Sequence, residues 1–416
     1  MRQQNKKDLK SRTKVSAIKK EPEWVFCLSI YIVLFFALFY LFINQARGFC
    51  VSDFPAHISA AKNGKGYSIT NVFLYLSNKV AGNIGCAAYL ASVVLITMFL
   101  SGIILKTYLD SELTTGEYGW AKTFLTASAL FFIGGIYVPN IYPYFYLAQN
   151  YTGPGSAGSI CTQPWHNPTY QLMRLFGIAT LFFFFKIRSQ YLVKGIKIKD
   201  WLLFFISLTL TNAAKPNFFI AFAPAMLIFL IYDFIRQRGK GFFRMVYFGA
   251  GVLCSMPVLF IQKSILFPED VAKINNTEQV YGIEFSTSVI QKMWREGTVM
   301  PYLVTGLLFF VIITILCVIN HRIDQRIIFG WLMLIIAILE FWFVTETGPR
   351  AAAGNFGWGI PFCAFALANI CIERLILLKS HISPKVFPFI ITPLVCMFIT
   401  GIVYFAYALT GGDFNI

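Results

Sequence analysis

Hydrophobic residues gather in long uninterrupted runs along this chain, and short polar segments separate the runs. A helix of about 20 apolar residues crosses the roughly 30 Å hydrocarbon layer of a bilayer. The pattern therefore predicts an all-α fold, a polytopic membrane helix bundle of about eleven transmembrane helices within a range of about 10–13. The predicted spans are 24–44, 82–105, 121–139, 170–187, 201–213, 218–235, 245–262, 301–320, 327–344, 360–378 and 386–410.

The run at 201–213 is shorter than the others and ends just before Lys215, Pro216 and Asn217. We expect it to stop below the membrane surface and turn back, which is tolerated only where protein or a water-filled cavity covers the backbone. An ionisable side chain such as Lys215 at this depth is a functional candidate. The alternative is that Lys215 extends its ammonium group to the membrane surface.

Basic residues are distributed unevenly between the two sides of the predicted bundle. With the N-terminus in the cytoplasm, the inner segments hold 24 of the 35 Lys and Arg residues, as the positive-inside rule requires. These segments are 1–23, 106–122, 186–200, 236–244, 321–326 and 374–385. We therefore predict a multi-pass protein of the plasma membrane with a cytoplasmic N-terminus and an extracytoplasmic C-terminus. Residues 1–23 are expected to form a polybasic tail on anionic lipid, and 24–416 a single transmembrane domain.

Composition supports lipid as the solvent. The chain is 57% hydrophobic and 13% charged, which is about half the charged fraction of a soluble domain. The formal net charge of +16 is accounted for by the inner segments, so membrane lipids and no nucleic acid are expected as partners. The sequence has no P-loop, no dinucleotide-binding fingerprint and no HExxH motif.

The predicted outer segments are longer than the inner ones and hold the candidate chemistry. They include 45–81, 140–169, 263–300 and 345–359. In the first, Pro55 and two following glycines predict a short juxtamembrane helix over 54–63 with Asp53 at its N-terminus. Apolar residues at helical spacing over 69–80 predict a second helix along the membrane interface.

Asp53 and His57 lie four residues apart, a spacing that places two side chains on one face of a helix. Together they are candidates for acid–base chemistry. The alternatives are that Asp53 is an ordinary N-cap carboxylate and that His57 is a hydrogen-bonded histidine at the interface.

The second outer loop brings Trp165 and His166 between two prolines, which makes a rigid, non-helical entry into the next span. Trp165 also fits an interfacial aromatic belt.

The loop at 345–359 surrounds Glu346, Arg350, Asn355 and Trp358 with four glycines and a proline. Such a backbone can approach a ligand closely. The alternative is that Glu346 and Arg350 simply pair with each other.

Nine cysteines are present, and only Cys50 and Cys161 fall in predicted outer loops. A disulfide between these two is expected if the outer face is an oxidising compartment. The other seven lie in spans or near their ends, where cysteine behaves as a small buried apolar residue.

The chain has many predicted spans and a long first outer loop, in which an Asp begins a pair of juxtamembrane helices. In these features it resembles the GT-C superfamily of membrane glycosyltransferases. The resemblance rests on Ser52–His57, on Lys215–Asn217 and on Glu346–Arg350. It implies an enzyme that transfers a sugar from a polyprenyl-phosphate donor to an envelope glycan or lipid acceptor on the outer face.

The resemblance also implies roles for the candidate residues. Asp53 is the expected base, and His57 or His166 would orient that base or the acceptor. Lys215 and Arg350 would bind the lipid phosphate as fixed cations. Aromatic residues such as Trp165 and Trp358 would stack on sugar rings. No cofactor is certain, and because no double-acid pair follows the first span, the need for a divalent metal stays open.

Other functions fit parts of the same pattern. A polymerase or ligase of lipid-linked polysaccharide would also work on the outer face, and the mixed charge of 263–300 does not separate the two classes. A transporter or flippase would place charged groups near the midplane, often in repeated halves, and the chain has no internal repeat. A non-catalytic scaffold of an envelope complex would need none of the outer residues.

Overall fold

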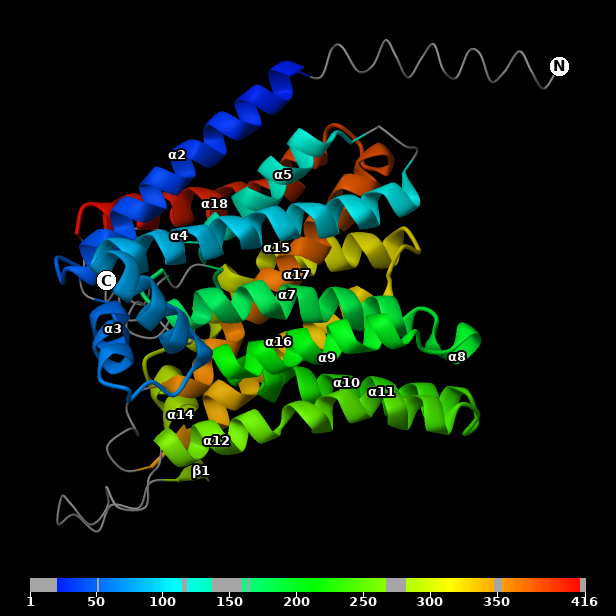
Figure 1. The fold of residues 1–416 in the computed structure, drawn as a ribbon. Coiled ribbons are helices and arrows are strands. Elements are labelled where there is room, and N and C mark those ends of the chain that lie inside the picture. Colours follow the sequence, from blue (N-terminus) through cyan, green and yellow to red (C-terminus); the bar gives the residue numbers. More distant parts are fainter. Residues whose placement is uncertain are drawn as a thin grey trace, which may run out of the picture.

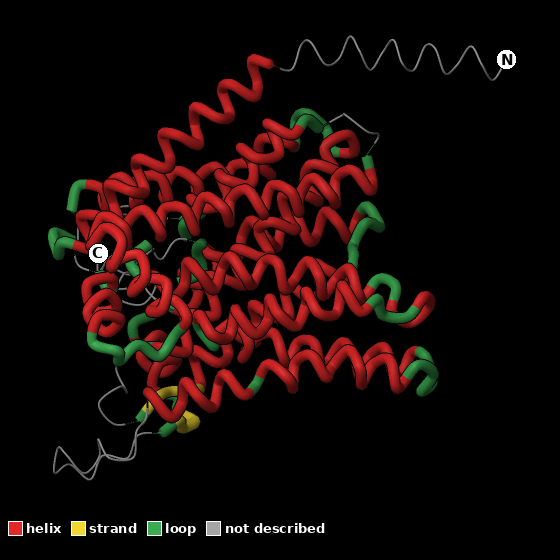
Figure 2. Tube along the Cα trace, in the orientation of Figure 1, coloured by secondary structure: helices red, strands yellow, loops and turns green. Residues whose placement is uncertain are grey.

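The computed structural model describes residues 21–50, 52–113, 118–136, 159–162, 165–266, 282–347 and 354–411. These residues are almost entirely helical, and most of the helices run between the same two ends of the molecule (Figures 1 and 2). The described elements are α2 (Glu21–Ala46), α3 (Phe54–Lys62), α4 (Ile69–Glu112), α5 (Trp120–Ala129), η1 (Leu130–Phe132), α7 (Pro168–Arg188), α8 (Tyr191–Lys194), α9 (Ile198–Ala214), α10 (Asn217–Arg236), α11 (Phe242–Ser255), α12 (Pro257–Leu266), β1 (Ile283–Phe285), α14 (Ser288–Arg295), α15 (Val299–Ile319), α16 (Gln325–Phe343), β2 (Val344–Glu346), η3 (Asn355–Trp358), α17 (Gly359–Leu378), η4 (Lys379–His381) and α18 (Phe387–Leu409).

Nine helical segments within the described residues are long and apolar enough to cross a membrane. They are Glu23–Ala46, Ile69–Glu112, Pro168–Arg188, Asn217–Arg236, Phe242–Ile265, Val299–Ile319, Gln325–Phe343, Asn355–His381 and Phe387–Leu409. The other two predicted spans are also helical but shorter: α9 has 17 residues, and α5 with η1 covers Trp120–Phe132. The prediction of an all-α, multi-pass membrane protein is confirmed.

The two ends of the bundle are named after the short helices that lie there, the α3 end and the α8 end (Figure 1). The short helix α8 lies at one end, and α3, α14 and the last turn of α18 lie at the other (Figure 1). The predicted polybasic tail lies outside the described residues, except that α2 begins at Glu21.

The predicted pair of juxtamembrane helices is present at the α3 end. The first is α3, which carries Pro55 in its first turn. The second is the start of α4, which Ser68 and Asn71 cap reciprocally. The helix is interrupted at Ala81 and Gly82, and Gly82 has φ +58°, a conformation that favours glycine. This break lets one continuous segment serve first as an interfacial helix and then as a span.

The interior is packed largely by aromatic rings. Phe184 of α7 contacts rings on α10, α11 and α16, with centroids 5.3 Å from Phe222, 5.6 Å from Phe248 and 4.5 Å from Phe329. A Cβ added at Gly177 of α7 would lie 2.6 Å from the Phe362 ring, so glycine permits α17 to pack closely there. These contacts fix α7 at the centre of the bundle, with its N-terminus at the α3 end.

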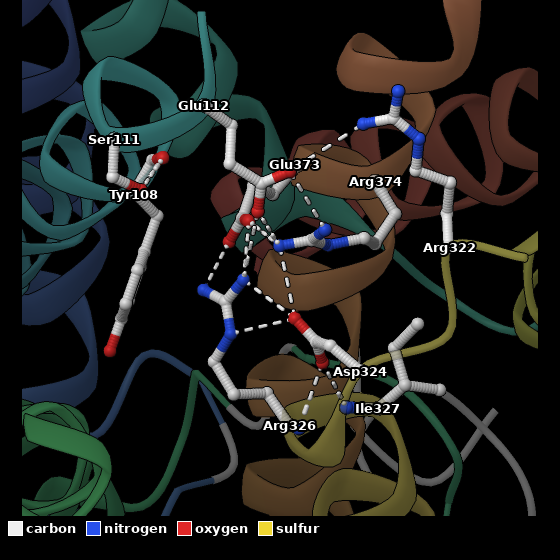
Figure 3. A network of polar contacts seen from close by, with 9 residues as sticks. All are labelled: Tyr108, Ser111, Glu112, Arg322, Asp324, Arg326, Ile327, Glu373 and Arg374. Carbon is white, nitrogen blue, oxygen red and sulfur yellow. Dashed lines mark hydrogen bonds and ion pairs between the residues drawn. The ribbon is translucent and has the colours of Figure 1, made fainter. Parts of the chain in front are cut away.

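A charged network closes the α8 end (Figure 3). Arg326 of α16 donates to Glu373 of α17 at 2.8 and 2.7 Å and to Asp324 at 2.7 Å. Arg374 of α17 donates to Glu112 at 2.7 Å, which brings in the end of α4. The end of α4 is thereby joined through side chains to α16 and α17, which lie far along the chain from it.

The predicted disulfide between Cys50 and Cys161 is not formed in this structure. The Cys50 thiol lies 3.9 Å from the carbonyl oxygen of Ala408, at the end of α18. The Cys161 sulfur lies 2.8 Å from the Ser159 hydroxyl, within its own segment. Each thiol is buried among different neighbours, so the two loops are held together by other contacts.

Candidate functional site

Asn167 is the residue on which the candidate site is built. It caps α7, because its side-chain Oδ1 accepts a hydrogen bond from the backbone N–H of Tyr170 at 3.0 Å, and Pro168 begins the helix. Its Nδ2 donates to the Asp53 carboxylate at 2.9 Å. Its Oδ1 also accepts from the ammonium of Lys215 at 3.5 Å. One buried amide therefore lies between a carboxylate and a cation from two other elements.

Asp53 occupies the N-cap position of α3 but does not act as a cap. Its side chain makes no capping hydrogen bond, and its backbone is helical, with φ −68° and ψ −12°. The carboxylate is exposed and accepts from Asn167 instead. The N-cap interpretation of this aspartate is therefore wrong, and its carboxylate is available to a molecule at the surface of the α3 end.

Lys215 lies in the break between α9 and α10. Its backbone is extended, with φ −160° and ψ 123°, and its side chain is 5% exposed. The ammonium donates to Thr169 Oγ1 at 3.2 Å and lies 4.4 Å from the ring centroid of Trp358. The surface-reaching alternative is wrong, because this cation is retained within the protein among polar and aromatic partners.

The two candidate histidines lie beside this pair of charges. His57 is half-buried and its Nδ1 lies 3.5 Å from Asn71 Nδ2, which also donates to the His57 carbonyl oxygen at 3.0 Å. The ring of His166 packs 5.4 Å from Trp358. Burial lowers the pKa of each imidazole to about 4; the positive charge of Lys215 adds to this effect at both rings, and Asp53 opposes it. Both rings are therefore neutral at neutral pH.

The first and second predicted outer loops are joined at this point. The Ser52 hydroxyl donates to the carbonyl oxygen of His166 at 2.9 Å. Since Asn167 follows His166 and Asp53 follows Ser52, this bond places the two site residues opposite each other.

A second polar cluster adjoins the first through α10. Asn355 Nδ2 donates to the Glu346 carboxylate at 2.5 Å, and Asn217 Nδ2 donates to the carbonyl oxygen of Asn355 at 2.6 Å. Glu346 is fixed by the pairing of β2 with β1, in which it lies opposite Ile283. Glu346 and Asn355 are thus brought together, and Asn217, two residues after Lys215 in the chain, holds them beside that residue.

The two candidate tryptophans have different environments. Trp165 is fully buried and packs 5.6 Å from Phe132 and 5.2 Å from Phe405. Its stacking on a sugar stays a prediction. The ring belongs to the hydrophobic core because the chain enters the bundle before α7 begins. Trp358 is also largely buried, but it borders the ammonium of Lys215.

Arg350 lies outside the described residues, so its predicted phosphate contact and its pairing with Glu346 stay predictions. Across the part of the chain that the structure describes, no group of three or more His, Cys, Asp or Glu side chains is arranged to hold a metal ion.

Sequence reasoning missed Asn167 and Thr169 as site residues. The signal was present for Asn167, because Asn directly before Pro is a typical start of a helix. That signal predicts the cap but not the bond to Asp53, which is 114 residues earlier in the chain.

No protein-family model, no curated protein and no solved structure matches this chain.

Proposed function

We propose that this protein is a membrane glycosyltransferase that moves a sugar from a polyprenyl-phosphate donor to a glycan or lipid acceptor at the α3 end. One observation carries the proposal: a single buried amide, Asn167, lies between the exposed carboxylate of Asp53 and the buried ammonium of Lys215. Transfer from a lipid phosphate needs a base for the acceptor and a cation for the phosphate, and it needs them at a fixed separation.

In the proposed reaction the Asp53 carboxylate takes the proton of an acceptor hydroxyl. The acceptor oxygen attacks the anomeric carbon and forms the new glycosidic bond, while the bond from that carbon to the phosphate oxygen breaks. The electron pair leaves with the polyprenyl phosphate, whose added charge the ammonium of Lys215 offsets. This single displacement inverts the anomeric carbon. Arg350 is the second cation that we propose for the phosphate.

An apolar groove on the bundle supports a donor with a long apolar chain. It lies between α10 and α11, has a volume of about 910 Å³, and is lined by apolar residues throughout. The groove begins at Phe219, two residues after Asn217, and continues along α10 to Phe234. A lipid whose phosphate is at Lys215 would therefore find apolar surface for its tail directly below.

Orientation supports the same proposal. The segments between spans at the α8 end carry the excess of Lys and Arg, which favours a cytoplasmic position for that end by the positive-inside rule. With that orientation, the α3 end would face the outside of the plasma membrane. Sugar carried on a membrane lipid is the donor that is accessible there.

The test is transfer of radiolabelled sugar from a polyprenyl-phosphate donor, measured in membranes at equal expression. We expect Asp53→Asn and Lys215→Ala to lower the rate at least 100-fold, because each removes a group that acts on the reacting atoms. Glu284→Gln and Lys263→Ala are matched controls, since both side chains are exposed in the described structure, and they should keep the wild-type rate.

Full transfer by Asp53→Asn would overturn the assignment of the base. Absence of transfer from every polyprenyl-phosphate sugar tested, by a wild-type protein that is folded, would overturn the proposal itself. Measurement of lipid or solute flux would then test the transporter alternative.

A further inference from the structure

The turn that presents Lys215 leaves a backbone carbonyl at the end of α9 without its usual helical hydrogen-bond donor. The N–H of Lys215 donates to the carbonyl oxygen of Thr211 at 2.9 Å, which is the last regular hydrogen bond of α9. In an uninterrupted helix the next carbonyl, that of Asn212, would accept from residue 216. Residue 216 is proline and has no N–H. Because the end of α9 is buried, this carbonyl needs another donor.

Gln262 of α12 supplies that donor. Its Nε2 lies 3.0 Å from the carbonyl oxygen of Asn212 and 3.0 Å from that of Ala213. The side chain is 3% exposed, so neither bond competes with bulk water. Gln262, which follows Lys215 by 47 residues in the chain, therefore supplies the hydrogen bonds that the carbonyl oxygens at the end of α9 need.

A second contact fixes the same junction. The side chain of Asn212 donates to Ser255 Oγ at 3.1 Å, where α11 ends and α12 is about to begin at Pro257. The end of α9 is thus bonded to both sides of the break between α11 and α12.

We propose that Gln262 is a positioning residue that holds the Lys215 ammonium at its place beside Asn167. This inference deepens the proposed function. Its activity test rests on that function, whereas its structural test is independent of it. The extended conformation at Lys215 turns the side chain from the axis of α9 toward Thr169 and Trp358. If the end of α9 frays, the ammonium loses that fixed direction.

The same helix borders the groove proposed for the lipid tail. Leu259 of α12 lines the groove, and Gln262 follows it by three residues, on the neighbouring turn. The surface that would contact the lipid and the side chain that holds the Lys215 turn are therefore parts of one short rigid element.

The structural test is hydrogen exchange of the backbone amides from 209 to 220 in the full-length protein in detergent. Gln262→Leu keeps the approximate size but removes the donor, and Gln262→Glu places an oxygen where the donating nitrogen was. We expect the Lys215 amide to exchange about tenfold faster in both variants, the change that loss of a typical buried hydrogen bond gives. Ser264→Ala, on the exposed side of α12, is the control and should exchange as wild type does.

Unchanged exchange at Lys215 in both Gln262 variants would overturn the proposal. Faster exchange over the whole protein would also overturn it, since that result would assign Gln262 a role in global stability only.

The activity test compares Gln262→Leu, Lys215→Ala and the double variant. We expect Gln262→Leu to raise the KM for the polyprenyl-phosphate donor about tenfold, with little change in the KM for the acceptor. The double variant should match Lys215→Ala alone, because Gln262 acts through that side chain. Losses that multiply in the double variant would contradict the proposal. A wild-type protein without transfer activity would refute the proposed function, while the exchange result would still decide the role of Gln262.

Discussion

The charged network at the α8 end makes a quantitative prediction about stability (Figure 3). Arg326 is the residue to change, because its side chain is only 13% exposed and it bonds to Asp324 and to Glu373, which is 2% exposed. Its guanidinium also lies 4.0 Å from the ring centroid of Tyr108. Replacement by methionine keeps much of the volume but leaves these carboxylates with one buried cation fewer.

The expected cost is about 3–5 kcal/mol of unfolding free energy, which is typical when one partner of a buried ion pair is removed. Arg322 is the internal control. Its side chain is 46% exposed, and its ion pair with Glu112 is long, at 4.0 Å. Arg322→Met should therefore cost about 1 kcal/mol or less. The two variants remove the same charge from the same network, but Arg326 is more buried and has more close partners than Arg322.

Reversible unfolding of the purified protein in mixed detergent micelles would measure both costs. The double variant Arg326→Met with Glu373→Met should recover most of the loss, because it removes one charge of each sign and fills the space with apolar volume. Equal small losses for Arg322→Met and Arg326→Met would refute the reasoning. So would a double variant that is less stable than Arg326→Met alone.

Two other predictions concern the thiols and the histidines. No disulfide joins Cys50 and Cys161 in the structure, so the denatured protein should bind a maleimide reagent at all nine of its cysteines without prior reduction. A mass showing seven labels would indicate one disulfide, and peptide mapping would show whether it joins this pair. His57 and His166 have a folded-state pKa of about 4, below the usual 6.5. The unfolded chain therefore binds protons first as the pH falls, and the stability that these neutral rings contribute is fully present above pH 6.5 and is lost as the pH falls toward about 4. Unfolding free energy measured against pH should fall less steeply over that interval when both are replaced by Gln, and an unchanged slope would contradict the assignment.

Much of the architecture is local information, and the sequence predicts it well. The length of an apolar run sets whether a helix can cross a bilayer, so the spans follow from the order of residues alone. Signals within a few residues also predicted the two juxtamembrane helices, through Pro55 at the start of the first and the apolar spacing that ends near Gly82 in the second. The same signals placed Asp53 correctly at the start of α3.

The partners of these residues were not local. Asp53 bonds to Asn167, Lys215 bonds to Asn167 and Thr169, and Gln262 bonds to the end of α9. A single sequence shows that each of these side chains is polar, but it does not show which distant residue contacts it.

Burial gives residues of the same type different environments in this protein. Trp165 and Trp358 have the same chemistry and lie in predicted outer loops, yet Trp165 packs in the core and Trp358 lies beside a cation. Cys50 and Cys161 lie in adjacent predicted outer loops, but their sulfur atoms contact different partners, the Ala408 carbonyl oxygen and the Ser159 hydroxyl. The sequence by itself determined the membrane class, the helices and their order, because these depend on hydrophobic length and local helix signals. Only the tertiary structure decided which polar groups meet at the α3 end, because those contacts join residues far apart in the chain through the packing of helices.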